Sequence, residues 1–336
     1  MQICICGGGS LAHVCSGVLS SDTNNKVRLL TRRPTEWRDS ITVFDPNGKT
    51  YTGSFDLVSA KPSEVIPNAD VVLLCLPGYA IAEVLQQIKP FLSEHTFVGS
   101  IVCSTGFFFF AHEILAPQTP LFGFQRVPFI ARTIHYGESA NLLGYKNEVA
   151  VVIESHNEDA EALRQWIEKA FLTPTRLLNH YYEVSLTNSN PILHTSRLYS
   201  MWKDWKGEPF STNTPFYRDW TLEASEILIA MDEEFMQLLD HLPVDKRQMP
   251  PLLEYYESTD AASLTRKIAS IKAFEGILSP MTETPEGWIP DFKSRYFTED
   301  FPYGLQFIKN LAQEHGVATP TIDLILGWGL SKVVEK

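Results

Sequence analysis

The chain opens with Met1-Gln2-Ile3-Cys4-Ile5-Cys6-Gly7-Gly8-Gly9-Ser10-Leu11-Ala12, and this stretch decides the fold. Residues 2–6 form an apolar run typical of a buried strand, and residues 11–19 follow a helical pattern. The pattern Gly7-x-Gly9-x-x-Ala12 stands between them. A glycine turn that follows a strand and opens a helix is the setting of a dinucleotide-binding fingerprint.

The spacing of the small residues in this turn suits a pyrophosphate. The first glycine permits the tight turn, the second lets the backbone approach the ligand, and a small third residue lets the helix pack closely on the strand. Free N–H groups at a helix N-terminus favour an anion. We therefore predict that a nicotinamide dinucleotide binds here, the alternative being a glycine turn without a ligand. The residues expected to hold it are Gly7, Gly9, Ser10, Leu11 and Ala12.

The end of the second predicted strand, residues 26–31, bears on the choice of cofactor. An acidic residue at this point would bind the ribose 2′-hydroxyl of NAD. The chain has Thr31, Arg32 and Arg33 instead, and no carboxylate before Glu36. Because guanidinium groups suit a 2′-phosphate, we predict a preference for NADP(H). If both arginines are merely solvated, NAD(H) serves instead.

The first half alternates strands with helices, which predicts an α/β domain with a doubly wound parallel sheet. Strands are expected at 2–6, 26–31, 69–75, 96–103 and 149–154, with an amphipathic helix at 158–171. The turn-rich segment 41–61 predicts a hairpin. Ligands bind beyond the carboxyl ends of such strands, so Leu76, Pro77 and Gly78 are candidates to flank the cofactor. An ordinary strand-to-helix turn explains these three residues equally well.

After residue 175 the pattern becomes helical, and no further strand is predicted. Apolar residues recur at helical spacing in four segments separated by prolines, namely 221–242, 264–278, 304–315 and 321–334. This change places a domain boundary near 175–182. We expect a Rossmann domain over 1–178 and an all-helical substrate domain over 179–336. A length of 336 residues agrees with two domains.

Composition narrows the class of protein further. The chain is 44% hydrophobic and 20% charged, as in ordinary globular proteins, and its net charge of −12 disfavours nucleic acid as a partner. Its five cysteines lie mostly in apolar runs, which predicts buried thiols in a reducing cytoplasm and no metal site. No signal peptide is visible, and the apolar runs are too short to span a bilayer. The phenylalanine run 107–110 is expected in the core.

Two segments of the second half carry candidate chemistry. The stretch Asn188-Ser189-Asn190-Pro191-Ile192-Leu193-His194 predicts a helix start, with Asn190 as the cap and Pro191 as the first helical residue. Asn190 and His194 then lie one turn apart on the same face. Further along, Arg295 suits a carboxylate clamp and Asp300 suits the orientation of a histidine. From the pattern alone, a cap, a core histidine and helix-end charges are the simpler interpretations.

Together these segments resemble the opine dehydrogenase family, the octopine and nopaline dehydrogenase relatives. The resemblance covers nearly the whole chain and includes Phe124-Gln125-Arg126-Val127-Pro128. It implies NAD(P)H-dependent reductive condensation of a 2-oxo acid with the amino group of an amino acid through an imine. It also implies roles for particular residues: His194 as the general acid/base, Asp300 holding its imidazole, Arg295 binding the oxo-acid carboxylate, Asn190 lining the same face, and Gln125 reaching the substrate.

Other interpretations stay open. The first half also resembles ketopantoate reductases, which reduce a 2-oxo acid to a hydroxy acid, but no lysine equivalent to theirs stands beside Asn190. A non-catalytic redox sensor that binds NADP(H) is a further alternative. Trp202, Tyr255 and Tyr256 are candidate walls of the amine pocket, or core residues. The identities of both substrates and the formation of a homodimer are left open.

Overall fold

The computed structural model describes residues 1–104, 106–155 and 160–334, and the chain divides into two compact units, Met1–Ser185 and Leu186–Lys336. This division lies somewhat beyond the boundary expected from the sequence. The assignment of nucleotide binding to one part and catalysis to the other remains a prediction. No helix among the described residues is long and apolar enough to cross a membrane.

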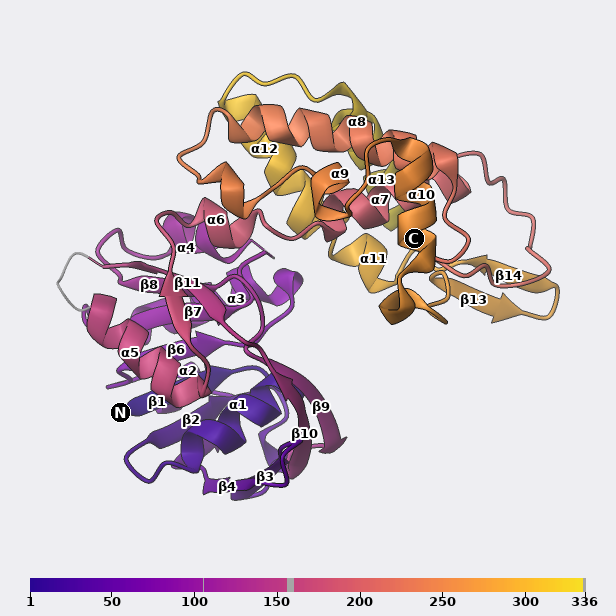
Figure 1. Ribbon diagram of the computed structural model, residues 1–336. Coiled ribbons are helices and arrows are strands. Elements are labelled where there is room, and N and C mark those ends of the chain that lie inside the picture. The colour runs from indigo at the N-terminus through magenta and orange to yellow at the C-terminus, as the bar shows by residue number, and fades with distance from the viewer. Residues whose placement is uncertain (105, 156–159, 335–336) are drawn as a thin grey trace. The chain divides into compact units, whose positions relative to one another are not determined.

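The first unit is built on one large sheet (Figure 1). Its strands run in the order β12-β11-β8-β7-β6-β1-β2-β5. All neighbouring strands pair in parallel except β8 and β11, which pair antiparallel. The predicted doubly wound sheet is therefore confirmed. The strands are β1 (Gln2–Cys6), β2 (Lys26–Leu30), β5 (Leu57–Ser59), β6 (Val71–Leu74), β7 (Phe97–Ile101), β8 (Leu121–Phe124), β11 (Val149–Glu154) and β12 (Thr175–Leu177).

The alternation of side chains along β1 explains why both faces of the sheet are covered. Ile3 and Ile5 enter the core cluster shared with helices α1 (Ser10–Ser20) and α5 (Ala160–Phe171). Cys4 and Cys6 enter the cluster shared with α3 (Gly78–Ile88) and α4 (Phe107–Ile114). A strand buried on both faces is apolar throughout, as predicted for residues 2–6. All the cysteines are free and buried, and Phe107 and Phe108 are fully buried.

A second sheet, of order β4-β3-β10-β9, packs over α1. Its strands β3 (Ser40–Phe44) and β4 (Thr50–Ser54) form the hairpin predicted within 41–61. The strands β9 (Phe129–His135) and β10 (Ser139–Tyr145) were not predicted, because exposed apolar side chains and two register shifts blur their alternation. The turn between them carries Tyr136 to the glycine loop. Short helices α2 (Pro62–Val65) and α6 (Tyr182–Ser185) complete the unit.

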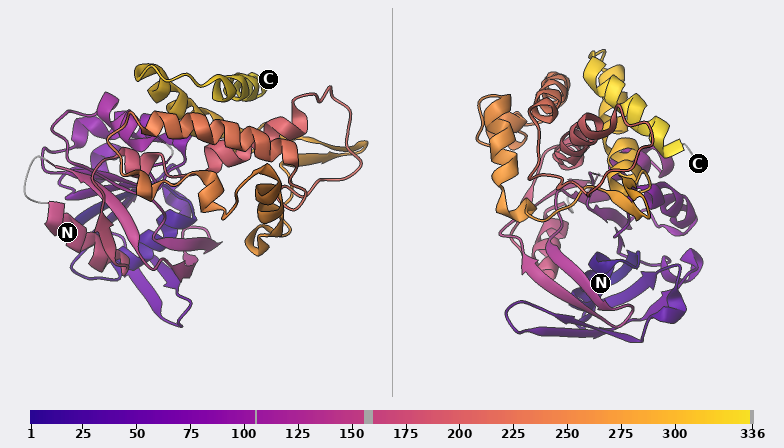
Figure 2. Two further views of the ribbon diagram at one scale, coloured as in Figure 1. Left: turned by 45° about the horizontal axis from the view of Figure 1, so that its top comes forward. Right: turned by 90° about the vertical axis from the view of Figure 1, so that its right-hand side faces the viewer.

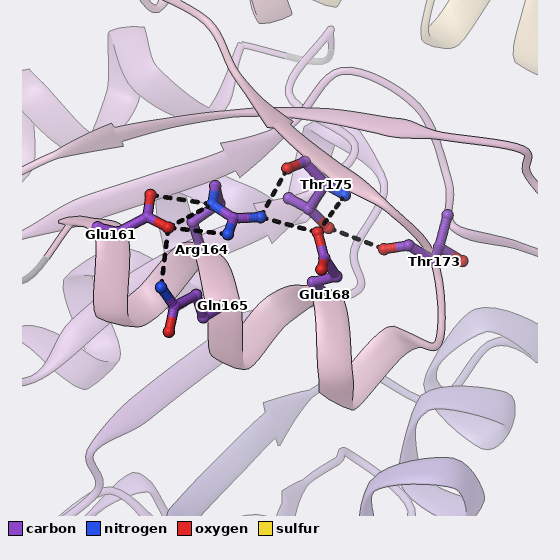
Figure 3. Close-up of polar contacts among 6 residues, drawn as sticks. All are labelled: Glu161, Arg164, Gln165, Glu168, Thr173 and Thr175. Carbon is purple, nitrogen blue, oxygen red and sulfur yellow. Dashed lines mark hydrogen bonds and ion pairs between the residues drawn. The ribbon is translucent and has the colours of Figure 1, made fainter.

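Helix α5 is tied to β12 at the edge of the large sheet (Figure 3). Arg164 donates hydrogen bonds to Glu161, to Glu168 and to the carbonyl of Thr175, and Glu168 accepts the Thr175 N–H at 3.0 Å. These contacts fix the turn at the C-terminal end of α5. The helix was predicted over 158–171; it is described from Ala160, and residues 158 and 159 lie outside the described part of the chain.

The second unit is mainly helical. Helices α7 (Asn190–Trp202), α8 (Leu222–Leu239) and α13 (Pro320–Val334) pack on one another (Figure 2). Around them lie α9 (Leu252–Tyr255), α10 (Ala261–Ser270), α11 (Arg295–Thr298), a π-helical turn at Phe301–Leu305, and α12 (Gln306–Glu314). The helical segments predicted at 221–242, 304–315 and 321–334 correspond to α8, to α12 and to α13.

Two predictions for the second half are wrong in detail. Strands do occur after residue 175: β12, and the antiparallel hairpin of β13 (Met281–Thr284) and β14 (Gly287–Pro290). Each has four residues or fewer, too short for an alternating pattern to stand out. The helix predicted over 264–278 ends at Ser270, and a short 3₁₀ turn, Lys272–Phe274, follows. This turn brings Phe274 against Tyr217, whose ring lies 4.1 Å away between centroids.

Candidate active site

The glycine loop of the first unit borders a cavity of about 510 Å³ beyond the carboxyl ends of β1, β2 and β6. Gly7 has φ of +139°, and a Cβ there would lie 2.5 Å from the carbonyl oxygen of Cys75. Only glycine fits this position without strain. Gly9 caps α1 without a side-chain hydrogen bond, and a Cβ on it would meet nothing within 4 Å. The backbone at Gly9 is thus open to the cavity.

Most of the predicted cofactor residues line this cavity. They are Gly7, Gly9, Thr31, Arg32, Arg33, Leu76 and Pro77. Ser10, Leu11 and Ala12 do not line it. The Ser10 hydroxyl accepts the N–H of Thr133 at 3.1 Å, and Ala12 is fully buried in the core. The glycines that precede α1 therefore line the cavity, and the predicted direct contact of Ser10, Leu11 and Ala12 with it is not found.

The two arginines after β2 differ in their surroundings. The Arg33 guanidinium lies 3.9 Å from the centroid of the Tyr136 ring and pairs with Glu36 at 3.1 Å. Arg32 is exposed at the cavity and makes no hydrogen bond or ion pair with any described residue. Arg32 is consequently the cation free to receive an anionic group.

Tyr136 and His13 are residues of this site that the sequence did not indicate. A Cβ on Gly8 would lie 2.5 Å from the Tyr136 hydroxyl, so this tyrosine covers the glycine loop. His13, fully buried in α1, bonds the Gly9 carbonyl through Nδ1 at 2.9 Å, and its Nε2 accepts the N–H of Gly137 at 2.7 Å. Burial lowers the pKa of His13, which keeps the ring neutral, as these two bonds require.

In the second unit, His194 lies at the centre of a buried polar cluster. Its Nδ1 lies 2.8 Å from Asp300 Oδ2, and its Nε2 lies 2.8 Å from the hydroxyl of Tyr217. The ring of Tyr296 packs against the imidazole, with centroids 4.7 Å apart. The carboxylate accepts the Nδ1–H, and the phenol donates to Nε2 of the neutral ring. Residues far apart in the sequence thus complete one hydrogen-bonded chain.

Tyr217 is the member of this cluster that sequence reasoning missed. It lies in a loop before α8, and neither its spacing nor its neighbours indicate a link to His194. Burial raises the pKa of Tyr217, and the neighbouring Tyr296 and Asp300 raise it further. Burial likewise raises the pKa of Tyr256 to about 12. These phenols therefore stay protonated at neutral pH and act as hydrogen-bond donors.

The other predicted residues of this unit lie around α7 and α11. Helix α7 is capped by Ser189 and begins at Asn190, so the prediction of Asn190 as the cap is wrong. The Asn188 side chain accepts the N–H of Asn190 at 3.3 Å and takes up one free donor of the first turn. Arg295 begins α11 and is exposed, and its side chain makes no hydrogen bond or ion pair with a described residue. Its guanidinium is free for a carboxylate.

The remaining candidates divide between surface and core. In the first unit, Gln125 donates from Nε2 to the carbonyl of Glu183 at 3.0 Å. Trp202 is a core residue that packs against Phe297. Tyr255 is exposed, whereas Tyr256 is buried.

Comparison with known proteins relates the second half of the chain to one family and nearly the whole chain to opine dehydrogenases. Residues 177–332 match the family described as NAD/NADP octopine/nopaline dehydrogenase, alpha-helical domain. The opine dehydrogenase of Haliotis discus hannai is 28% identical, over 98% of this chain and 89% of its own length. The octopine dehydrogenase of Mizuhopecten yessoensis is 27% identical, over 99% and 90%.

Solved structures agree with the sequence relatives. An octopine dehydrogenase in complex with NADH and L-arginine superposes with a TM-score of 0.86 at 26% identity, covering 99% of this chain and 89% of that one. A yersinopine dehydrogenase, at 14% identity and a TM-score of 0.73, shares the fold. The ketopantoate reductase family model matches residues 3–103, within the first unit.

Proposed function

Because the chain belongs to the opine dehydrogenase family, we propose that it joins a 2-oxo acid to the amino group of an amino acid and reduces the resulting imine. It is an NAD(P)-dependent oxidoreductase of the type that acts on CH–NH bonds. The observation that carries the proposed reaction is the hydrogen bond between His194 and Asp300. The condensation requires an acid/base group in addition to the hydride donor, and His194 held by Asp300 provides this group.

The first unit would hold the dinucleotide at the glycine-loop cavity. Gly7 gives the turn its shape, the uncapped N-terminus of α1 faces a pyrophosphate, and Leu76 and Pro77 flank the cavity. When bound, the reduced dinucleotide supplies the hydride. This assignment is supported by the open space beside Gly9, where a Cβ would meet no protein atom within 4 Å.

We propose NADP(H) as the preferred cofactor on the basis of the free guanidinium of Arg32. Arg33 and Thr31 line the same cavity. If Arg32 binds a 2′-phosphate, then Arg32→Ala raises KM for NADPH about tenfold, which corresponds to a loss of about 1.4 kcal/mol of binding free energy. KM for NADH should stay within twofold of the native value. Arg38→Ala, a change at an exposed neighbouring cation, is the matched control. A lower KM for NADH than for NADPH in the native enzyme would contradict this preference.

His194 would move the protons of the condensation. The amino group enters as an ammonium ion and must lose a proton before its nitrogen attacks the carbonyl carbon. Neutral imidazole takes that proton, and Asp300 stabilises the imidazolium that forms. When the C–O bond of the carbinolamine breaks, the imidazolium returns the proton to the leaving hydroxide, and water departs. The histidine ends neutral and the protonated imine is ready for reduction.

Arg295 would fix the carboxylate of the oxo acid. Its guanidinium is exposed and without a described partner, and a bidentate pair with a carboxylate would set the orientation of the reacting carbon. Asn190 begins the helix that carries His194, and we assign it a place along the same face. Gln125 is assigned a weaker, orienting role, since its amide nitrogen is already bound to a carbonyl.

A turnover assay tests the proposed reaction. NADPH and NADH oxidation would be followed with pyruvate or 2-oxoglutarate, each with and without a panel of amino acids. We expect turnover that depends on the amine and falls at least 100-fold in His194→Ala. His315→Ala, an exposed histidine at the end of α12, is the control and keeps native activity. Turnover without an amine would contradict the proposal and favour a simple 2-oxo acid reductase.

We also propose that the enzyme works in the cytoplasm. The cysteines Cys4, Cys6, Cys15, Cys75 and Cys103 are all free and buried, which fits a reducing compartment. Fractionation of the source cells with an antibody to the native chain tests this location.

A further inference from the structure

The imidazole of His194 has no ring nitrogen left open. Asp300 occupies Nδ1, and the hydroxyl of Tyr217 occupies Nε2, each at 2.8 Å. In a dyad that acts directly, Nε2 would face the substrate while the carboxylate holds Nδ1. Here a phenol stands at the nitrogen that has to exchange protons, so the route of the proton must account for that phenol.

The position of Tyr217 is built by several independent contacts. Its ring stacks on Phe274, with centroids 4.1 Å apart and planes inclined by 23°. Its backbone is held from α7, the helix that carries His194: Arg197 donates to the carbonyls of Phe216 at 3.1 Å and Asp219 at 2.7 Å. The hydrogen bond between Tyr217 and His194 is therefore set by a rigid frame.

The buried guanidinium of Arg197 is hydrogen-bonded to the backbone around Tyr217. Its strong partners are backbone carbonyls, and burial lowers the pKa of Arg197 to about 10. A cation buried without a hydrogen-bonded carboxylate costs free energy. Its hydrogen bonds offset part of this cost, and they fix the loop on both sides of Tyr217. Arg197 lies one turn of α7 after His194.

Tyr296 is a second tyrosine of this cluster. Its ring packs against the imidazole of His194, with centroids 4.7 Å apart, and it is less deeply buried than Tyr217. Tyr296 directly follows Arg295, the residue to which we assign the oxo-acid carboxylate. The hydrogen-bonded chain from Asp300 through His194 to Tyr217 therefore lies beside α11, the helix that begins with Arg295.

We propose that Tyr217 relays protons between His194 Nε2 and the substrate side of the site, an inference that rests on the proposed function. In the dehydration step the phenol O–H bond breaks towards the leaving hydroxide, and water forms. The same phenol oxygen takes the Nε2 proton of the imidazolium. Tyr217 is thereby restored, and His194 becomes neutral with its Nδ1–H still bound to Asp300. In the earlier step, loss of the ammonium proton, both transfers run in reverse.

Tyr217→Phe tests the relay, because it removes the hydroxyl and keeps the ring that stacks on Phe274. We expect kcat to fall about 100-fold or more, while KM for the oxo acid stays within a few-fold. In mixtures of H2O and D2O, the native kcat should curve with the deuterium fraction, because two protons move together, and the residual kcat of the variant should not. Tyr199→Phe, on the same helix and packed on Trp328, is the control and keeps native kinetics.

A second measurement does not depend on turnover. The ¹⁵N resonances of His194, assigned by their loss in His194→Gln, should show a proton on Nδ1 and a hydrogen-bonded, unprotonated Nε2 at neutral pH. In Tyr217→Phe the Nε2 resonance should shift. Unchanged histidine resonances would overturn the hydrogen bond on which the relay depends.

The kinetic outcomes separate the relay from the proposed function. Native kcat in Tyr217→Phe would overturn the relay and leave the condensation standing. A higher kcat/KM in this variant would also overturn it, because the phenol would then block Nε2 and have to move aside. A native enzyme without amine-dependent turnover would overturn the proposed function itself.

Discussion

The glycine-loop cavity and the His194 cluster are built in opposite ways. The cavity is shaped mainly by backbone: a positive φ at Gly7, an uncapped helix start at Gly9, and the ends of parallel strands. The cluster is made of side chains from separate segments, joined by hydrogen bonds to Asp300 and to Tyr217. A site of the first kind can be recognised in a short stretch of sequence, whereas a site of the second kind exists only after folding.

The largest effect should come from the side-chain site. Asp300→Asn removes the negative charge that stabilises the His194 imidazolium, so we expect kcat to fall between about 10²- and 10⁴-fold. The dissociation constant for NADPH, measured by fluorescence titration, should stay within twofold, because the glycine-loop cavity belongs to the first unit.

Asp204→Asn is the matched control for Asp300→Asn, because Asp204 is an exposed aspartate of the same unit. It should leave both kcat and cofactor affinity at native values. If Asp300→Asn weakened NADPH binding as strongly as it slowed turnover, the two sites would not be separable in the way their construction indicates.

The backbone site should respond to added methyl groups at neighbouring glycines in different ways. Gly7→Ala forces a Cβ against the Cys75 carbonyl at a positive φ, which should lower the free energy of unfolding by about 1–3 kcal/mol. Gly9→Ala meets no protein atom, so its stability should stay within about 0.5 kcal/mol of native. Its methyl group would instead enter the cavity and weaken NADPH binding about tenfold.

Urea unfolding and NADPH titration of both glycine variants measure these effects. The pair serves as its own control, since the two changes add the same group two residues apart in one loop. Equal losses of stability in Gly7→Ala and Gly9→Ala, or native cofactor affinity in Gly9→Ala, would contradict the assignment of the cavity to the dinucleotide.

The same contrast explains what the sequence could and could not predict. The parallel sheet followed from local patterns, since β1 alternates side chains between two covered faces and the glycine turn follows it directly. The hairpin β13–β14 was missed because its strands are too short to show a period. The family resemblance pointed to His194 and Asp300, but no spacing could indicate Tyr217, whose place depends on Arg197 and on the turn that ends α10 early.

The smallest effect concerns His13, a side chain that is hydrogen-bonded to the backbone of the glycine loop. Its neutral ring links the Gly9 carbonyl to the N–H of Gly137, with Trp37, Tyr136 and the Arg33 cation around it. Burial lowers its pKa below the ordinary 6.5. The unfolded chain therefore binds the proton at a higher pH than the folded chain. Stability due to neutral His13 is present above about pH 6.5 and is lost as the pH falls through the folded pKa.

His13→Gln measures this contribution by thermal unfolding across pH. At pH 7.5 the variant should be less stable than the native protein by about 1 kcal/mol, because a buried hydrogen bond is lost. As the pH falls below about 6.5 this difference should narrow, because His13 of the unfolded native chain then binds a proton and the glutamine of the variant cannot. His95→Gln, at a histidine whose side chain is 79% exposed, should show no such pH dependence. If the difference in free energy of unfolding between the native protein and His13→Gln did not change with pH, the ring would hold the glycine loop by packing alone. The hydrogen bonds of the neutral imidazole would then not contribute to the backbone site.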